Sequence, residues 1–299
     1  MVARVGVVTV LFKSGPVLPG FYASLAAQAG VELYLVVVGN DQDQASLDQC
    51  AELSEQAGIE TTIIANDANL GVAAANNQGI AACLDKGVDL VLIANNDIEF
   101  AADTISTLAA ALEAGYDAVS PLITYYDEPD RIWYGGGHLN ALLARTQHVG
   151  QGARVDRADT TLRTTGYAPT CFMLVRPEVF VSVGLMDPDY FVYYDDSDFV
   201  FRMGRLGLSL GYEPSAEVRH KVSSSTGGGT SPFAIYYTNR NRVVFIRKNL
   251  GPVRAALPLA YMLATKAIRL PFMQKAERRT TLSALRDGFA FDLRPKAPA

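Results

Sequence analysis

The sequence contains little cysteine and no long hydrophobic run. Its 299 residues include three cysteines, Cys50, Cys83 and Cys171. Their odd number and wide spacing exclude a disulfide framework and a zinc-ligand pattern, so we expect small buried thiols in a reducing compartment. The longest uncharged stretch near the C-terminus, residues 255–265, has eleven residues. A membrane-spanning helix needs about 20, so this stretch does not predict a span.

Other motifs are missing as well. No G-x-G-x-x-G fingerprint and no P-loop lysine motif occur, which leaves dinucleotide binding and P-loop phosphate binding unsupported. Residues 1–12 lack the small-residue cleavage site of a signal peptide and have the pattern of a first strand. We therefore expect a cytoplasmic protein.

The net charge of −5 hides an uneven distribution. Residues 240–299 carry thirteen Lys and Arg against three acidic residues, a formal charge of +10, and the rest of the chain carries −15. A basic tail behind an acidic body indicates a surface that meets anionic lipid or phosphate. The alternative is an ordinary solvated set of helices.

Strand and helix patterns alternate along residues 4–123. Apolar, β-branched stretches predict strands at 4–12, 31–40, 59–65 and 88–94, with helical patterns between them at 18–30, 44–56 and 71–87, then at 102–115. This alternation predicts a mostly parallel sheet with helices on both faces, an α/β fold. Ligands bind such sheets at the carboxyl edge of the strands, where Asn40 and Asp97 are expected.

The second half of the chain has a different character. Residues 124–169 predict short strands and loops, Pro177 opens a short helix, and a strand pair is expected at 208–214 and 216–220. Helical patterns follow at 233–250, 252–272 and 277–289. We therefore predict a catalytic domain over 1–231, with halves 1–123 and 124–231, and a basic helical extension over 232–299.

Two groups of carboxylates are candidates for chemistry. Asp195, Asp196 and Asp198 lie among aromatic residues, which favours a raised pKa and a general base; the alternative is the acidic first turn of a helix. Asp97 ends a buried strand beside two asparagines, which suits a hard cation shared with substrate phosphates. The alternative there is a turn. His220, which ends a late strand, is a second ligand or a structural histidine.

A third segment, residues 69–79, opens a helix of small residues. Its asparagines and glycines allow close backbone approach to a ligand and place donors at the helix start.

Taken in order, these stretches resemble glycosyltransferase family 2 with its GT-A fold, and most of all the bacterial rhamnosyltransferase-like enzymes of surface-polysaccharide assembly. The matching segments, in chain order, are Thr9 to Phe12, the strand ending at Asn40, Asn69 to Gly79, Asn95 to Asp97, Trp133 to Gly136, Tyr193 to Arg202, His220, and Tyr237 to Asn241.

The resemblance implies roles for individual residues. Asp196 would be the catalytic base, with Asp195 beside it, and Asp97 and His220 would hold Mn²⁺ or Mg²⁺. The implied donor-binding residues are Thr9, Val10, Phe12, Asn40, Asn69, Gly71, Asn76, Asn96, Asp97 and Arg240. The implied acceptor-binding residues are Trp133, Gly136 and Asp198.

The resemblance also implies a reaction. An inverting enzyme would move a sugar, with rhamnose favoured, from a dTDP- or UDP-sugar to a glycan or a polyprenyl-diphosphate-linked acceptor at the inner face of the cell membrane. No nucleic-acid partner is expected. Two alternatives stay open: a non-catalytic nucleotide-sugar or glycan-binding module, and a sugar nucleotidyltransferase. The latter should carry a Gly-rich, Arg-containing loop after its first strand, and residues 9–20 do not.

Overall fold

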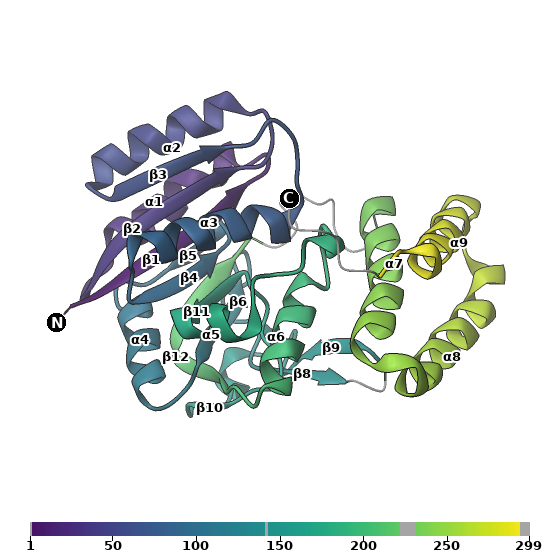
Figure 1. Ribbon diagram of the computed structural model, residues 1–299. Coiled ribbons are helices and arrows are strands. Elements are labelled where there is room, and N and C mark those ends of the chain that lie inside the picture. The colour runs from purple at the N-terminus through teal and green to yellow at the C-terminus, as the bar shows by residue number, and fades with distance from the viewer. Residues whose placement is uncertain (1, 141–142, 222–230, 294–299) are drawn as a thin grey trace.

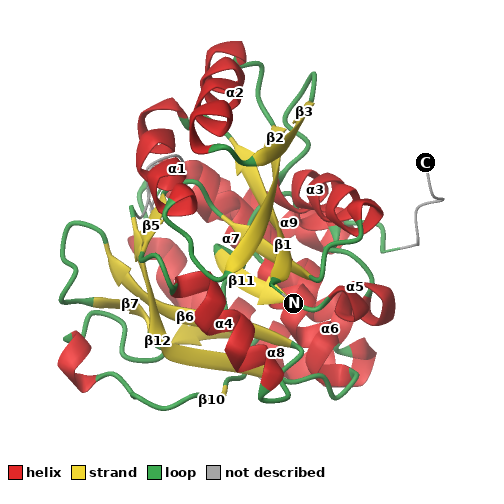
Figure 2. Ribbon diagram, turned by 90° about the vertical axis from the view of Figure 1, so that its left-hand side faces the viewer, coloured by secondary structure: helices red, strands yellow, loops and turns green. Residues whose placement is uncertain are grey.

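The computed structural model describes residues 2–140, 143–221 and 231–293. Its centre is a twisted sheet in the order β10-β12-β6-β11-β4-β1-β2-β3 (Figure 2). The predicted strands of the first half form its parallel part: β1 (Ala3–Leu11), β2 (Val31–Gly39), β3 (Glu60–Ala65) and β4 (Leu90–Ala94). Most side chains of β1 and β2 and all of those of β4 are buried, as expected for strands covered on both faces.

The other half of the sheet is mixed. The strands are β6 (Ala118–Tyr125), β10 (Arg163–Thr164), β11 (Phe172–Val175) and β12 (Leu210–His220). β11 runs antiparallel to both β4 and β6, and β12 runs parallel to β6. Shorter strands complete this half: β5 (Ile98–Phe100) on β12, β7 (Ile132–Tyr134) on β6, and the hairpin of β8 (Gly137–Asn140) and β9 (Arg145–His148).

The predicted strand pair at 208–214 and 216–220 is wrong in one respect. The structure has a single strand, β12, whose pairing with β6 shifts register between Glu213 and Glu217. The extra residues of such a bulge bend a strand without ending it.

Helices cover both faces of the sheet (Figure 1). The predicted alternation is confirmed by α1 (Leu18–Ala26), α2 (Gln44–Ala57), α3 (Val72–Lys86) and α4 (Thr104–Glu113). Two more helices follow β11, namely α5 (Pro177–Val183) and α6 (Asp195–Arg205), with the short 3-10 turn η3 (Pro188–Tyr190) between them. The three cysteines are free and buried, as predicted.

Three helices, α7 (Pro232–Asn249), α8 (Gly251–Arg269) and α9 (Lys275–Ala290), gather on one side of the sheet domain (Figure 1). α7 joins them to the domain, because its Val244 and Phe245 share a core cluster with Tyr190 of η3. A second small cluster packs the helices on one another. Within the described ranges, no helix is both long and apolar enough to cross a membrane.

Candidate active site

The structure brings together the two residues predicted to hold a metal. Asp97 follows β4, and His220 ends β12, whose last residue pairs with Ile98 of β5. This pairing places Oδ1 of Asp97 3.2 Å from Nε2 of His220. Both side chains are largely buried, at 13% and 8% exposure. The two groups thus form one centre at the carboxyl edge of β4.

This pair fits a divalent cation whose remaining ligands come from a substrate and from water. Two ligands bound at about 2.1 Å and at right angles to each other are separated by roughly 3 Å, close to the observed separation of the Asp97 and His220 atoms. Among the described residues, no group of three or more His, Cys, Asp or Glu is placed to hold a metal. Phosphate oxygens and water would therefore supply most of the coordination, as is common for Mg²⁺.

A hydrogen bond connects the end of β1 to the segment that carries Asp97. Asn96 donates from Nδ2 to the carbonyl oxygen of Val10 at 2.8 Å. Thr9 is fully buried, so its predicted contact with a donor is not supported, whereas Val10 and Phe12 are half-buried at the strand end. Asn96 therefore aligns the β1 and β4 edges, and Val10 and Phe12 remain available to a ligand.

Asn40 and its neighbours, predicted to bind the donor, make hydrogen bonds within the protein. Asn40 is 2% exposed, its Nδ2 donates to Oδ1 of Asn69 and to the carbonyl of Gly71, and its Oδ1 accepts from the backbone of Leu70. Its amide therefore fastens the 69–71 loop instead of facing a nucleotide base. Gly71, at φ +86°, is needed because an added Cβ would lie 2.6 Å from the carbonyl oxygen of Phe191. Asn76 is buried in α3.

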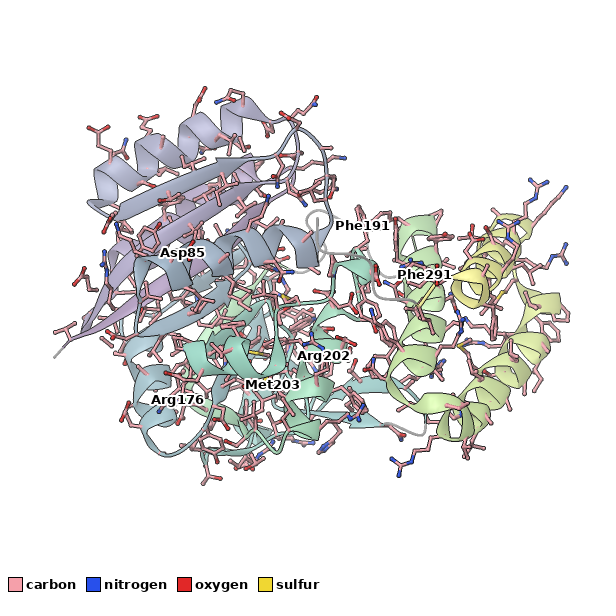
Figure 3. The ribbon with its side chains drawn as sticks, viewed as in Figure 1. Asp85, Arg176, Phe191, Arg202, Met203 and Phe291 are labelled. Carbon is pink, nitrogen blue, oxygen red and sulfur yellow. The ribbon has the colours of Figure 1, made fainter. Side chains whose placement is uncertain are left out.

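The loop 190–194 delivers the acidic cluster and is held in a strained conformation. Three of its non-glycine residues have positive φ: Phe191 (63°), Tyr193 (62°) and Tyr194 (70°). Such residues cost about 1–3 kcal/mol each and persist where surrounding contacts fix them. Asn241 of α7 provides these contacts, donating from Nδ2 to three carbonyls of this loop at 2.7 to 2.9 Å. Figure 3 shows Phe191 in this loop, where its ring stacks on Tyr237 of α7.

Asp196 lies at the start of α6 and faces a cleft. Its Oδ2 accepts a 2.5 Å hydrogen bond from the Tyr167 hydroxyl, and its Oδ1 accepts from the Ser197 hydroxyl at 3.0 Å. The cleft has a volume of about 470 Å³, and its polar lining includes Arg145, Thr146, Tyr167, Thr238, Asn239, Arg242 and Lys266. Asp196 is the only carboxylate among the residues described as lining this cleft. It is thus the acid of the cluster that is placed for chemistry.

The other two carboxylates of the cluster, those of Asp195 and Asp198, are buried and do not face the cleft. Asp195 is buried, and burial together with the adjacent Asp196 carboxylate raises the pKa of Asp195, which favours its neutral form. Asp198 is 1% exposed, and its oxygens accept from Tyr190, Arg202 and Asn249 at 3.0, 2.7 and 2.7 Å. These bonds tie α6 to η3 and α7. The predicted acceptor contact of Asp198 is therefore not supported, because the carboxylate is enclosed.

Trp133 and Gly136 do not line this cleft either. The Trp133 ring stands edge-on to the rings of His148 and His220, at centroid distances of 4.6 and 4.7 Å. His148 in turn stacks on Tyr167 at 5.8 Å. Gly136 is buried at φ +90°, beside the Arg163 guanidinium. The predicted acceptor contacts of Trp133 and Gly136 are not supported. Instead, Trp133 belongs to a row of rings that joins the Asp97 centre to the Asp196 cleft.

The side chain of Arg240 also makes its hydrogen bonds within the protein. Its guanidinium donates to the backbone carbonyl of Asp189 and to Oδ1 of Asn241, both at 2.7 Å, and lies 4.4 Å from the ring centroid of Phe291. Figure 3 shows Phe291 beyond α7, on the side of α9. Arg240 braces Asn241, and its predicted contact with a leaving diphosphate is not supported by this geometry.

Several residues of the site were not found from the sequence. Tyr167 and the cleft cations Arg145, Arg242 and Lys266 were not selected, since no local spacing connects them to Asp196. Asn241 ends the matched segment Tyr237 to Asn241, but it was given no role. The basic excess of the C-terminal part was the available signal for the cations.

The geometry defines a class of protein. A buried carboxylate–imidazole pair lies at the carboxyl edge of the sheet, and the carboxylate of Asp196 lines a cleft. Solved structures with this arrangement of helices and strands are GT-A glycosyltransferases. The mannosyltransferase PcManGT of Pyrobaculum calidifontis, solved with GDP-Man and Mn²⁺, superposes with a TM-score of 0.59 and 16% identity over 96% of this chain and 75% of that one. GalNAc-T7, solved with UDP, GalNAc and Mn²⁺, gives a TM-score of 0.66 and 14% identity over 97% of this chain, which spans 56% of that protein.

The sequence model described as glycosyl transferase family 2 matches residues 6–184. The chain belongs to glycosyl transferase family 2, and its activity is glycosyl transfer. It is 27% identical to the N-acetylglucosaminyl-diphospho-decaprenol L-rhamnosyltransferase of Mycobacterium tuberculosis over 297 residues, which cover 91% of this chain and 94% of the relative. It is 22% identical to the dTDP-rhamnosyl transferase RfbF of Shigella flexneri over 282 residues, covering 89% and 91%.

Proposed function

We propose that this glycosyltransferase inverts the configuration of the sugar it transfers, and that it moves rhamnose from dTDP-rhamnose to a hydroxyl of a lipid-linked or growing bacterial surface polysaccharide. The observation that carries the proposal is that Asp196 lines a cleft to which Asp97 and His220, the pair at the sheet edge, do not contribute. The names of the two rhamnosyltransferase relatives support the choice of sugar. UDP-sugars are the second choice of donor.

The reaction would be a single displacement. Asp196 would take the proton of the acceptor hydroxyl as that oxygen attacks the anomeric carbon and the bond to the nucleoside diphosphate breaks. Tyr167 and Ser197 would orient the carboxylate, because each donates to one of its oxygens. No covalent intermediate on the protein is required. Mn²⁺ or Mg²⁺ held by Asp97 and His220 would offset negative charge on the leaving diphosphate.

A binding screen followed by a turnover assay tests this function. We expect dTDP, or UDP next, to raise the melting temperature in the presence of Mn²⁺ and much less after chelation, because a ligand at a hundred times its Kd adds about 2.7 kcal/mol of stability. Purified dTDP-rhamnose with an acceptor should then release dTDP. Binding without release under any acceptor condition would favour the non-catalytic module. Release of pyrophosphate from a nucleoside triphosphate would favour a nucleotidyltransferase.

We also propose that the protein works at the inner face of the cell membrane. α8 leaves large apolar side chains in solvent, among them Val253 at 87% exposure, with Phe272 just beyond the helix at 88%. The basic Arg254 and Arg269 lie near the two ends of the same helix. Apolar side chains can enter the headgroup region, and each nearby basic residue adds about 1 kcal/mol on anionic lipid.

Vesicle co-sedimentation checks this location. The protein should bind vesicles containing phosphatidylglycerol at low salt and dissociate at high salt, because salt screens surface charges. The double variant Val253→Ser and Phe272→Ser should bind several-fold more weakly. Val181→Ser is the matched control, since Val181 is 84% exposed but lies on α5. Equal binding of wild type to neutral and anionic vesicles at low salt would contradict the proposal.

A further inference from the structure

The cleft that holds Asp196 also holds three cations from three different elements. Arg242 comes from α7, Lys266 from α8 and Arg145 from β9. Arg242 is 4% exposed, and its guanidinium donates from Nε and Nη2 to the carbonyl of Leu143. Lys266 is half-buried, and Arg145 is exposed at the rim. The cations thus extend from the floor of the cleft to its opening.

No ion pair joins these cations to a carboxylate in the part of the chain that the structure describes. The ion pairs within 4.0 Å among residues 2–140, 143–221 and 231–293 do not include Arg145, Arg242 or Lys266. Glu277 attracts the Lys266 ammonium, but this is the last of the causes that act on the pKa of Lys266. The half-buried Arg202 of α6, by contrast, is paired with the Asp198 carboxylate at 2.7 Å. A carbonyl satisfies hydrogen-bond donors of Arg242 but does not neutralise its charge.

Bringing these three positive charges together costs free energy when no anion is bound. Burial lowers the pKa of Lys266, with repulsion from Arg242 and then Arg145 as the next causes. Burial likewise lowers the pKa of Arg242, and Arg145 contributes to this lowering. Buried charges are normally paired, because desolvation costs several kcal/mol per ion. A cluster of like charges lining a cleft is compensated when an anion binds there, and phosphate oxygens match arginine in geometry.

We propose that Arg145, Arg242 and Lys266 bind the diphosphate of a lipid-linked acceptor, whose sugar hydroxyl is thereby presented to Asp196. This inference rests on the proposed function and names the anionic part of the acceptor and the residues that recognise it. A volume of about 470 Å³ lies within the usual range for ligand sites, roughly 300–1,000 Å³. The site accommodates a sugar together with part of the diphosphate.

The donor diphosphate is the other candidate anion, and the geometry disfavours it. The donor's phosphates are assigned to Asp97 and His220, and neither residue lines this cleft. A lipid chain has an apolar side chain to follow beside the cations, since Tyr261 of α8 is 41% exposed and close enough to Arg242 to act on its pKa. The acceptor's chain would leave the cleft along Tyr261 toward the membrane surface.

The test uses geranylgeranyl diphosphate in detergent micelles as the probe, titrated calorimetrically into the full-length protein. Geranylgeraniol and inorganic pyrophosphate are the comparison ligands. Lys266→Ala and Arg145→Ala should each raise the Kd for geranylgeranyl diphosphate about tenfold or more, because a hydrogen bond to a charged group contributes roughly 1.5–3 kcal/mol. Arg205→Ala, which removes an exposed charge on α6 outside the cleft, should leave this Kd unchanged. The Kd of dTDP with Mn²⁺ should not change in any of the variants.

Several outcomes would overturn the inference. An unchanged Kd for geranylgeranyl diphosphate in both cleft variants would show that the cations do not bind it. A weaker Kd for dTDP with Mn²⁺ in the same variants would assign the cations to the donor. Pyrophosphate binding as tightly as the lipid diphosphate would make the cluster a site for free anions. Failure of wild type to bind any nucleoside diphosphate would instead count against the proposed function, while the lipid titrations still decide the role of the cluster.

Discussion

Replacing Asp196 with Asn is expected to reduce turnover by about 10²–10⁴-fold, the usual contribution of a general base, while dTDP binding stays close to wild type. Asn keeps the size of the side chain but cannot take the acceptor proton. The Tyr167 hydroxyl can still donate to the amide oxygen, so the start of α6 should keep its position. Steady-state assays of dTDP release, with the Kd for dTDP measured separately, give the two quantities.

Asp195→Asn is the matched control, since it makes the same change one residue earlier. It should reduce turnover less, because Asp195 is buried and does not line the cleft. Its effect on stability should depend on pH. Burial, with the Asp196 carboxylate next, raises the pKa of Asp195 in the folded protein. Stability is therefore lost as pH rises from about 4, the pKa of an unfolded aspartate, through the raised value.

The amide introduced by Asp195→Asn does not ionise, so this variant should lose less stability than wild type over the same pH range in urea unfolding. If Asp195→Asn reduced turnover more than Asp196→Asn, the base would be Asp195.

Replacing Asp97 with Ala is expected to abolish the Mn²⁺-dependent part of dTDP binding and to leave the fold intact. Asp97 supplies the one carboxylate of the Asp97–His220 pair, and its side chain lies at a strand end where the backbone pairing of β5 with β12 does not need it. The metal-dependent stabilisation, about 2.7 kcal/mol at a hundred times Kd, should disappear in thermal-shift measurements.

Asp67→Ala is the matched control for this change. Asp67 is an exposed aspartate that follows β3 at the same edge of the sheet. Its removal should leave the Mn²⁺ dependence as it is. An Asp97→Ala protein that still binds dTDP with the metal dependence of wild type would reduce Asp97 to a turn residue.

The sequence predicts the strands, the helices and the ends of the strands well, for a physical reason. Apolar stretches of β1, β2 and β4 can only be buried, and the polar residues that follow them must lie at the edge of the sheet. Asp97 and His220 were therefore predictable as members of one edge, although they lie far apart in the chain. Asp196 was predictable as one member of an acidic cluster beside aromatic residues.

The sequence does not predict which polar side chains face a ligand and which make hydrogen bonds within the protein. Whether Asn40 faces a ligand or the 69–71 loop depends on hydrogen bonds that form only after the loop has folded against β2. Asp198 looks equivalent to Asp196 in the sequence, but its oxygens are enclosed by α7 and η3. Arg145, Arg242 and Lys266 come together only through tertiary packing, and no spacing between them indicates a shared cleft.

The hydrogen bonds from Asn241 to the loop 190–194 have a consequence for how this enzyme and its relatives can change during evolution. The match to the family's sequence model ends at residue 184, before Asp196 and before α7. Nevertheless, the loop 190–194 is held in place by an α7 side chain, and Arg242 of the same helix lies in the cleft. A recombination event that exchanged the C-terminal helices between two relatives would exchange both the contacts that hold the loop before Asp196, the proposed base, and cations of the proposed acceptor site. Acceptor preference and catalytic alignment would then be inherited as one unit, while the donor edge of the sheet could diverge independently.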